Sequence, residues 1–204
     1  LTLVANTMTL AGTGNSISSG TIASPSGQLN IDTWNPASYI AVGASGVSDV
    51  LLLPQALWFG TSQVIQPGFN MVTVGSASHT GRVKINNAAT DNFIFTNNLT
   101  LQTANSGWID LYGSISDGGA TLPATFTANA STNKVYGYGG LTITTAGTQR
   151  YTDISIINGS TGNVNFITTG STADIYLNGL VQNNMSSTTS FKAGRNIVVA
   201  TGST

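Results

Sequence analysis

The chain has 204 residues, of which six are Lys or Arg and seven are Asp or Glu, so only 6% of it is charged. An ordinary soluble domain carries roughly 25% charged residues. Six scattered basic residues argue against a nucleic-acid-binding surface, and zero Cys with a single His excludes a zinc-type metal site and a disulfide framework.

The hydrophobic content of 40% does not fit an intrinsically disordered chain. The sequence has no apolar run of about 18 residues, which is the length that a membrane-spanning helix needs. What remains is an uncharged β protein with Thr, Ser and Asn on its wet faces. The composition therefore predicts neither a cofactor, nor a nucleic-acid partner, nor membrane insertion.

Short runs in which apolar and polar residues alternate recur along the whole chain. This period of two is the signature of β-strands, and Gly, Asn, Ser and Asp between the runs are typical of turns. The runs that predict strands are residues 1–4, 28–32, 39–42, 71–74, 82–85, 92–95, 99–101, 108–111, 141–143, 153–156, 163–166, 174–177 and 196–199.

The spacing of these runs places two strands in about 20 to 24 residues, which is the length of one coil of a parallel β-solenoid. We therefore expect one all-β domain over residues 1–204, with about eight to ten coils. Two segments break the pattern: residues 51–66, with a helical turn expected after Pro54, and residues 117–129, expected to be a loop excursion.

Several strings, taken in order, resemble a known family. Leu1 to Asn15 reads LTLVANTMTLAGTGN, Gly68 to Gly75 reads GFNMVTVG, and Phe95 to Thr103 reads FTNNLTLQT. Their succession is similar to the repeats of filamentous-haemagglutinin-like large exoproteins of bacteria, exported by two-partner secretion. The resemblance implies a right-handed parallel β-helix, secreted or at the cell surface, that works in adhesion or as a stalk. It brings no catalytic residues with it, and it implies a piece of the repeat region of a longer polypeptide or a processed product.

Two groups of side chains are candidate ligand contacts. His79, Arg82 and Lys84 lie close in sequence, and Arg82 and Lys84 share one face of a predicted strand. Tyr136 and Tyr138 share one side of another, where exposed rings could stack on a sugar or a protein and buried rings would fill the core.

Two acidic residues are candidates for a catalytic or calcium-binding pair. Asp110 is expected to face water on its strand, and Asp117 is expected to lie in a turn. Without a paired-carboxylate motif, the sequence does not predict an enzyme.

The leading interpretation is an extracellular structural or adhesive β-solenoid that stacks end to end, as a stalk or filament. Its expected partners are the rest of a longer polypeptide, copies of itself, or a cell-surface glycan or protein. The alternatives are a carbohydrate-binding, less readily a carbohydrate-cleaving, β-helix, and a solenoid that binds ice or another surface through Thr-x-Thr triplets. The triplets at 7–9, 125–127 and 142–144 are unevenly spaced, which argues against the last of these.

Overall fold

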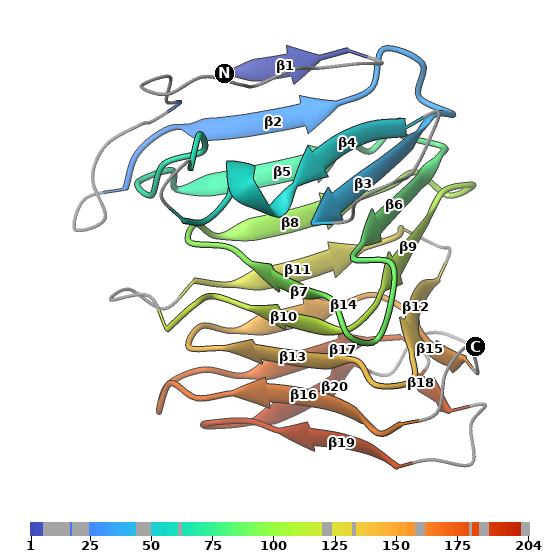
Figure 1. The fold of residues 1–204 in the computed structure, drawn as a ribbon. Coiled ribbons are helices and arrows are strands. Elements are labelled where there is room, and N and C mark those ends of the chain that lie inside the picture. The colour runs from blue at the N-terminus through green and yellow to red at the C-terminus, as the bar shows by residue number, and fades with distance from the viewer. Residues whose placement is uncertain are drawn as a thin grey trace.

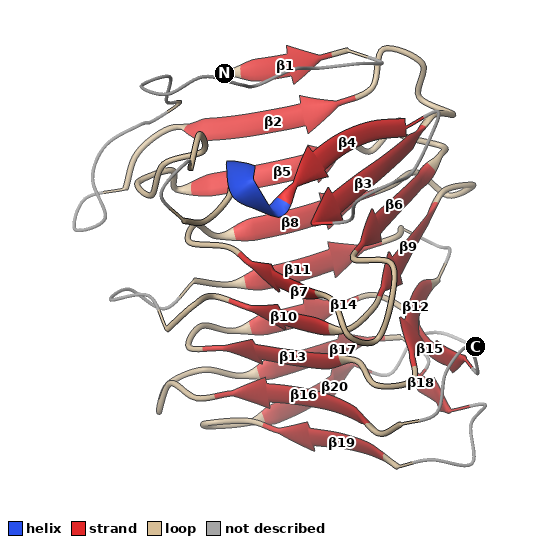
Figure 2. Ribbon diagram, in the orientation of Figure 1, coloured by secondary structure: helices blue, strands red, loops and turns tan. Residues whose placement is uncertain are grey.

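A computed structural model describes residues 1–5, 17, 25–43, 50–60, 63–119, 124–131, 134–157, 162–179, 181–183 and 188–200. Within these residues the chain forms twenty short β-strands and one 3-10 turn (Figure 1, Figure 2). The strands stack into three parallel sheets that wind around a common core, so the predicted all-β parallel β-solenoid is confirmed.

Each sheet is a single row of strands, and each strand pairs with the next in its row. The first sheet consists of β1 (Thr2–Val4), β2 (Gln28–Asp32), β5 (Met71–Gly75), β8 (Leu99–Gln102), β11 (Phe126–Asn129), β14 (Gln149–Tyr151), β17 (Ile175–Asn178) and β20 (Ile197–Ala200). The second sheet consists of β18 (Val181–Asn183), β15 (Ile154–Ile157), β12 (Val135–Tyr138), β9 (Trp108–Leu111), β6 (Arg82–Ile85), β3 (Tyr39–Gly43) and β4 (Val50–Pro54). The third sheet consists of β19 (Thr189–Lys192), β16 (Val164–Thr168), β13 (Thr142–Thr145), β10 (Ser114–Ser116) and β7 (Asn92–Ile94).

From β5 onward the chain visits the first, second and third sheets in turn and then returns to the first. Leu99 pairs with Phe126, Phe126 with Gln149 and Gln149 with Ile175, so one turn takes between 23 and 27 residues in this region. The described residues make about six turns, fewer than the eight to ten expected. The number differs because each complete turn holds three strands, whereas the sequence spacing suggested two.

All thirteen strand predictions coincide with strands of the structure. The loop excursion expected over residues 117–129 is shorter than predicted, because Phe126–Asn129 forms β11 in the middle of the first sheet. Residues 120–123 lie outside the described part of the chain.

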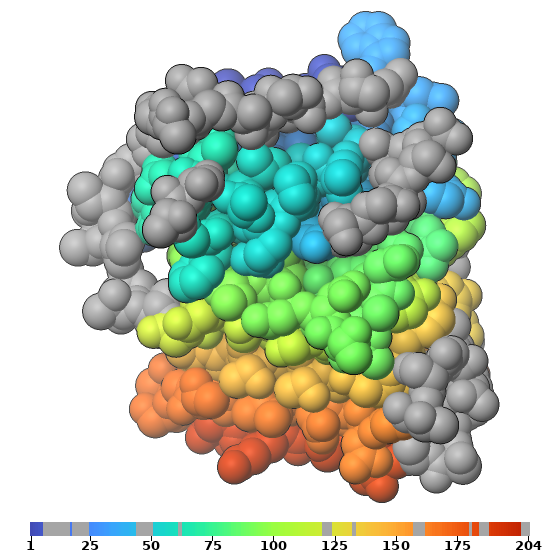
Figure 3. All heavy atoms as spheres, in the orientation of Figure 1, coloured from blue at the N-terminus to red at the C-terminus, as the bar shows by residue number. Residues whose placement is uncertain are grey.

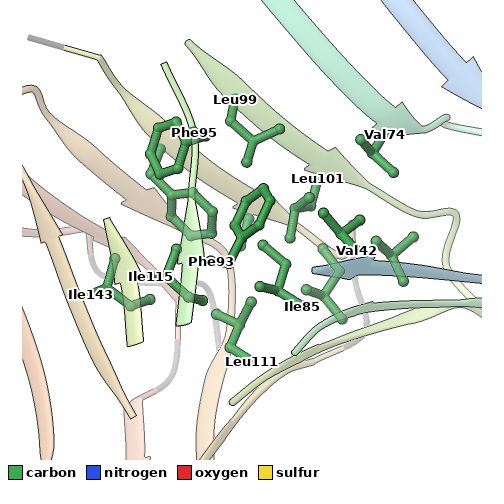
Figure 4. Close-up of a cluster of buried hydrophobic side chains, with 14 of the residues drawn as sticks. Val42, Val74, Ile85, Phe93, Phe95, Leu99, Leu101, Leu111, Ile115 and Ile143 are labelled. Carbon is green, nitrogen blue, oxygen red and sulfur yellow. The ribbon is translucent and has the colours of Figure 1, made fainter. Parts of the chain in front are cut away.

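Alternate residues of each strand point inward and form one continuous apolar core. Figure 4 shows part of it, with Leu99 and Leu101 from the first sheet, Ile85 and Leu111 from the second, and Ile115 from the third. An aromatic ladder, defined as the series of rings in contact from coil to coil, runs along this core. Its members are Trp58, Phe93, Phe95, Phe126, Tyr151, Phe166 and Phe191.

Residues 55–58 cover one end of the third sheet. The turn expected after Pro54 is present as the 3-10 turn η1 (Gln55–Leu57). The Gln55 side chain donates to the carbonyl of Ile94 (3.1 Å) and accepts from its N–H (2.9 Å), so it pairs with β7 as a neighbouring strand would. Trp58 packs edge-on against Phe93 with ring centroids 5.3 Å apart. This cap was not expected from the sequence, which showed no amphipathic capping helix.

Candidate functional site

Four of the five candidate residues lie together on the outer face of the second sheet. The register pairs Lys84 with Asp110, and Asp110 with Tyr136, across β6, β9 and β12. We call this surface the charged aromatic face and define it by Arg82, Lys84, Asp110, Tyr112, Tyr136 and Tyr138. Trp108 lies beside this face, because it stands on β9 and pairs with Arg82 on the neighbouring strand β6.

Asp110 is the buried centre of the charged aromatic face. Its carboxylate forms an ion pair with the guanidinium of Arg82, and the Tyr138 hydroxyl donates to it over 3.4 Å. Burial raises the pKa of Asp110, although Arg82 and Tyr138 pull that pKa down. The prediction that Asp110 faces water is therefore wrong: it stands on the outer face, but neighbouring side chains cover it completely.

Two tyrosines on this face stack on each other. The rings of Tyr112 and Tyr138 lie 3.9 Å apart and nearly parallel, at 14°. The Arg82 guanidinium donates to the Tyr112 hydroxyl over 3.5 Å, and the Lys84 ammonium lies 5.7 Å from the centre of the Tyr112 ring. Burial raises the pKa of both hydroxyls, so both stay protonated and able to donate at neutral pH.

His79 does not join this face. It is fully buried in the turn between β5 and β6, where its Nδ1 lies 2.9 Å from the Asp32 carboxylate and 3.4 Å from the Thr33 hydroxyl. Burial raises the pKa of Asp32, but hydrogen bonds from His79, from Ser76 and from the Thr33 N–H outweigh it, and the net shift is downward. His79 therefore stabilises the turn between β5 and β6, and it is too deeply buried to contact a ligand.

A second polar cluster lies where the first sheet nears its C-terminal end. The Asp174 carboxylate accepts from Arg195 Nε over 2.9 Å, from the Tyr176 hydroxyl over 3.1 Å and from the Asn196 N–H over 3.1 Å. Arg150 stacks over the Tyr176 ring, with its guanidinium carbon 3.9 Å from the ring centre. The cluster ties β20 to β17, because Asn196 directly precedes β20.

Acid is expected to loosen this last coil. The hydrogen bonds from Arg195, followed by that from Tyr176, hold the pKa of Asp174 well below its ordinary value, and burial only partly opposes them. The carboxylate therefore stabilises the fold fully above the ordinary Asp pKa of about 3.9, and this contribution is lost as the pH falls through the lower folded pKa. Urea midpoints of the wild type and of Asp174→Asn, compared from about pH 6 to pH 2, should converge as the pH falls. The urea midpoint of Arg195→Gln should converge on that of the wild type in the same way. A difference in midpoint that stays constant from about pH 6 to pH 2 would contradict the role assigned to Asp174.

Threonines line up on the outer face of the first sheet. The register stacks Thr73 on Thr100 and Thr100 on Thr127, but Arg150 and then Tyr176 continue the same row. The residues of the row come from different coils, so the Thr-x-Thr triplets within single strands did not reveal it. Of those triplets, 7–9 lies outside the described residues.

Two further acidic residues, Asp91 and Asp117, have structural partners. Asp91 accepts hydrogen bonds from the N–H groups of Asn87 and Ala88, and Asp117 accepts from those of Gly119 and Ala146. In the described ranges, His, Asp and Glu do not gather in groups of three or more that could hold a metal ion. The same ranges contain no helix long and apolar enough to span a membrane.

The last described coil exposes residues at positions that the inner coils bury. We call β18, β19 and β20 the terminal edge, since each is the last strand of its sheet in the described chain. Ile197 and Val199 pair with the buried Ile175 and Leu177, yet they are 47% and 60% exposed. Phe191 continues the aromatic ladder from Phe166 and is only partly buried.

Comparison with known proteins gives no relative: no family model matches the chain, and neither does a curated protein or a solved structure. The resemblance to haemagglutinin-like exoprotein repeats stays a prediction from the residues.

Proposed function

We propose that this chain is a structural segment of a secreted or cell-surface β-solenoid, which stacks end to end on a further coil as a stalk or filament. The observation that carries the proposal is the terminal edge, where Ile197 and Val199 stand at core positions and are not covered by a further strand of the described chain. Complete burial of an exposed Val or Ile side chain is favourable by roughly 1.5–3 kcal/mol, and about half of that remains to be gained at each of these half-exposed positions. The backbone edge of a parallel sheet is itself a template for another strand.

In the first sheet, the two end strands are compatible in direction. The first sheet begins at β1 and ends at β20, and all its strands run parallel, so β20 of one molecule and β1 of the next can pair without changing direction (Figure 3 shows the coils as successive layers). A head-to-tail contact of this kind repeats without closing and gives a filament. The net charge of −1 does not oppose such association.

Charging the terminal edge is expected to abolish assembly. Ile197→Lys with Val199→Lys puts two ammonium groups at core positions of the next interface, where each must be desolvated. Val198→Lys is the matched control, because Val198 lies on the same strand but pairs with the outward Tyr176. Light scattering and negative-stain electron microscopy over a concentration series should show rods that lengthen for the wild type and the control, and single short rods for the double variant.

The proposal fails if the wild type stays monomeric at the highest concentration while β20 exchanges its amide hydrogens slowly. Slow exchange would mean that the terminal edge is closed without any partner.

A further inference from the structure

The stacked tyrosines of the charged aromatic face are the closest pair of rings in the part of the chain that the structure describes. The ring centroids of Tyr112 and Tyr138 lie 3.9 Å apart, whereas those of the next closest pair, Phe166 and Phe191, lie 4.8 Å apart. Aromatic pairs in proteins usually keep their centroids about 4.5–7 Å apart. Every other described ring pair contains a phenylalanine, so this contact alone brings two phenols together.

The two rings leave the sheet from matched positions. Leu111 pairs with Gly137 across β9 and β12, so the residues that follow them, Tyr112 and Tyr138, stand opposite one another on neighbouring coils. The rings are nearly parallel, at 14°, so the π orbitals of one face those of the other. Both rings are partly exposed, and a small oxidant in solution can therefore reach them.

A proton acceptor stands beside the pair. The Tyr138 hydroxyl donates to the Asp110 carboxylate over 3.4 Å. A phenol that loses an electron becomes a strong acid, and an acceptor already in place lets its proton leave together with the electron. Burial raises the pKa of Asp110, which makes its carboxylate a better proton acceptor than an ordinary Asp. Asp110 therefore acts as a positioning residue that favours oxidation of the ring above it.

We propose that Tyr112 and Tyr138 are the site of an oxidative crosslink, a carbon–carbon bond (dityrosine) that joins two neighbouring coils. The oxidant is hydrogen peroxide acting through a haem peroxidase, which takes one electron and one proton from each phenol and leaves two phenoxyl radicals. The radicals combine through a bond between ring carbons adjacent to the hydroxyl-bearing carbons. Each of these carbons then passes its hydrogen, as a proton, to its own phenol oxygen. In total the pair loses two electrons and two protons, and one peroxide is reduced to two waters.

The crosslink stabilises the fold through the unfolded state. Tyr112 and Tyr138 are 26 positions apart, and a bond between them closes that loop in the unfolded chain. Loop closure lowers the entropy of the unfolded state, as a disulfide does, and this chain has no Cys to form one. The modification is separate from end-to-end stacking, because β9 and β12 are inner strands of the second sheet.

The test is to treat the purified chain, in dilute solution, with a haem peroxidase and hydrogen peroxide. Trypsin cleaves after Lys84, Lys134 and Arg150, so it separates Tyr112 in peptide 85–134 from Tyr138 in peptide 135–150. The oxidised wild type should give these two peptides joined, at their summed mass less two hydrogens, and fragmentation should place the bond at Tyr138. Neither peptide contains Met, so oxidation of Met by peroxide leaves this mass unchanged. The urea midpoint of the oxidised chain should lie above that of the untreated chain.

Three variants decide between the outcomes. Tyr138→Phe and Tyr112→Phe each keep a ring in the stack but remove one phenol, and each should abolish the joined peptides; if one of them fails to fold, the other still tests the proposal. Tyr136→Phe is the matched control, because it lies two residues away on the same strand, and it should crosslink like the wild type. Crosslinks that form mainly between molecules, or that persist in Tyr138→Phe, would each overturn the proposal. The Ile197→Lys/Val199→Lys variant should crosslink normally, which separates this proposal from the one on stacking.

Discussion

Replacing Phe126 by alanine is expected to lower the free energy of unfolding by about 3–5 kcal/mol. Phe126 is fully buried in β11, and its ring contacts Phe95 at 5.9 Å and Tyr151 at 6.1 Å between centroids. Alanine would leave a cavity in the middle of the aromatic ladder, and the coils above and below cannot close it because the strand hydrogen bonds fix their spacing. Each coil is stabilised by its neighbours, so a gap at this position weakens the coupling between the two halves of the solenoid.

Urea unfolding followed by circular dichroism measures this loss. Phe59→Ala is the matched control: Phe59 is 43% exposed beside η1 and should change stability by less than about 1 kcal/mol. Fluorescence of the buried Trp58, recorded with Trp34 and Trp108 replaced by phenylalanine, should separate from the dichroism signal in Phe126→Ala if the two halves come apart. A loss below about 1 kcal/mol would mean that the ring of Phe126 contributes little to the stability of the fold.

The strands could be predicted because most of them alternate between a buried apolar and an outward polar residue. Strand β14 was missed because this rule fails there: Gln149 points inward, where its amide donates to the carbonyls of Ile143 and Ile167 and its oxygen accepts from the Tyr151 hydroxyl. A buried polar residue with all these hydrogen-bond partners is stable in a core. In the sequence alone, however, a polar residue at an inward position interrupts the alternating pattern and suggests a turn. Strand β11 was missed for a similar reason, since only Phe126 and the small Ala128 mark its inner side.

The charged aromatic face could be predicted only in part, because its residues meet across coils. Lys84, Asp110 and Tyr136 are spaced by 26 residues, and so are Tyr112 and Tyr138. That constant spacing is a signal present in the sequence, but it has meaning only once the length of a turn is known. With two strands assumed in each coil, the expected coil length of 20 to 24 residues was too short to align Lys84, Asp110 and Tyr136. The neighbours that cover Asp110 could therefore not be identified, and Tyr112 was overlooked.

Replacing Arg82 by leucine is expected to destabilise the chain by about 3 kcal/mol at neutral pH, near the lower end for breaking a buried ion pair. Arg82 keeps 23% of its side chain exposed, whereas Asp110 is completely buried. Removing the guanidinium leaves a buried carboxylate with the Tyr138 hydroxyl as its described hydrogen-bond donor and the charge of Lys84 on the neighbouring strand. Replacing both residues by leucine should recover most of the loss, because an apolar pair of similar volume has no charge to desolvate.

The pH dependence distinguishes a lost charge partner from lost packing. Burial already holds the pKa of Asp110 above its ordinary value, and without Arg82 that pKa rises further. A carboxyl group with a raised folded pKa binds its proton more tightly in the folded chain, so stability falls as the pH rises from the ordinary Asp value through the folded one. The deficit of Arg82→Leu should therefore be large at neutral pH and shrink on acidification, whereas that of the double variant, which has no carboxyl group at this position, should not shrink. Equal urea midpoints for the single variant in acid and at neutral pH, each measured against the wild type, would show that Arg82 acts through its aliphatic stem alone.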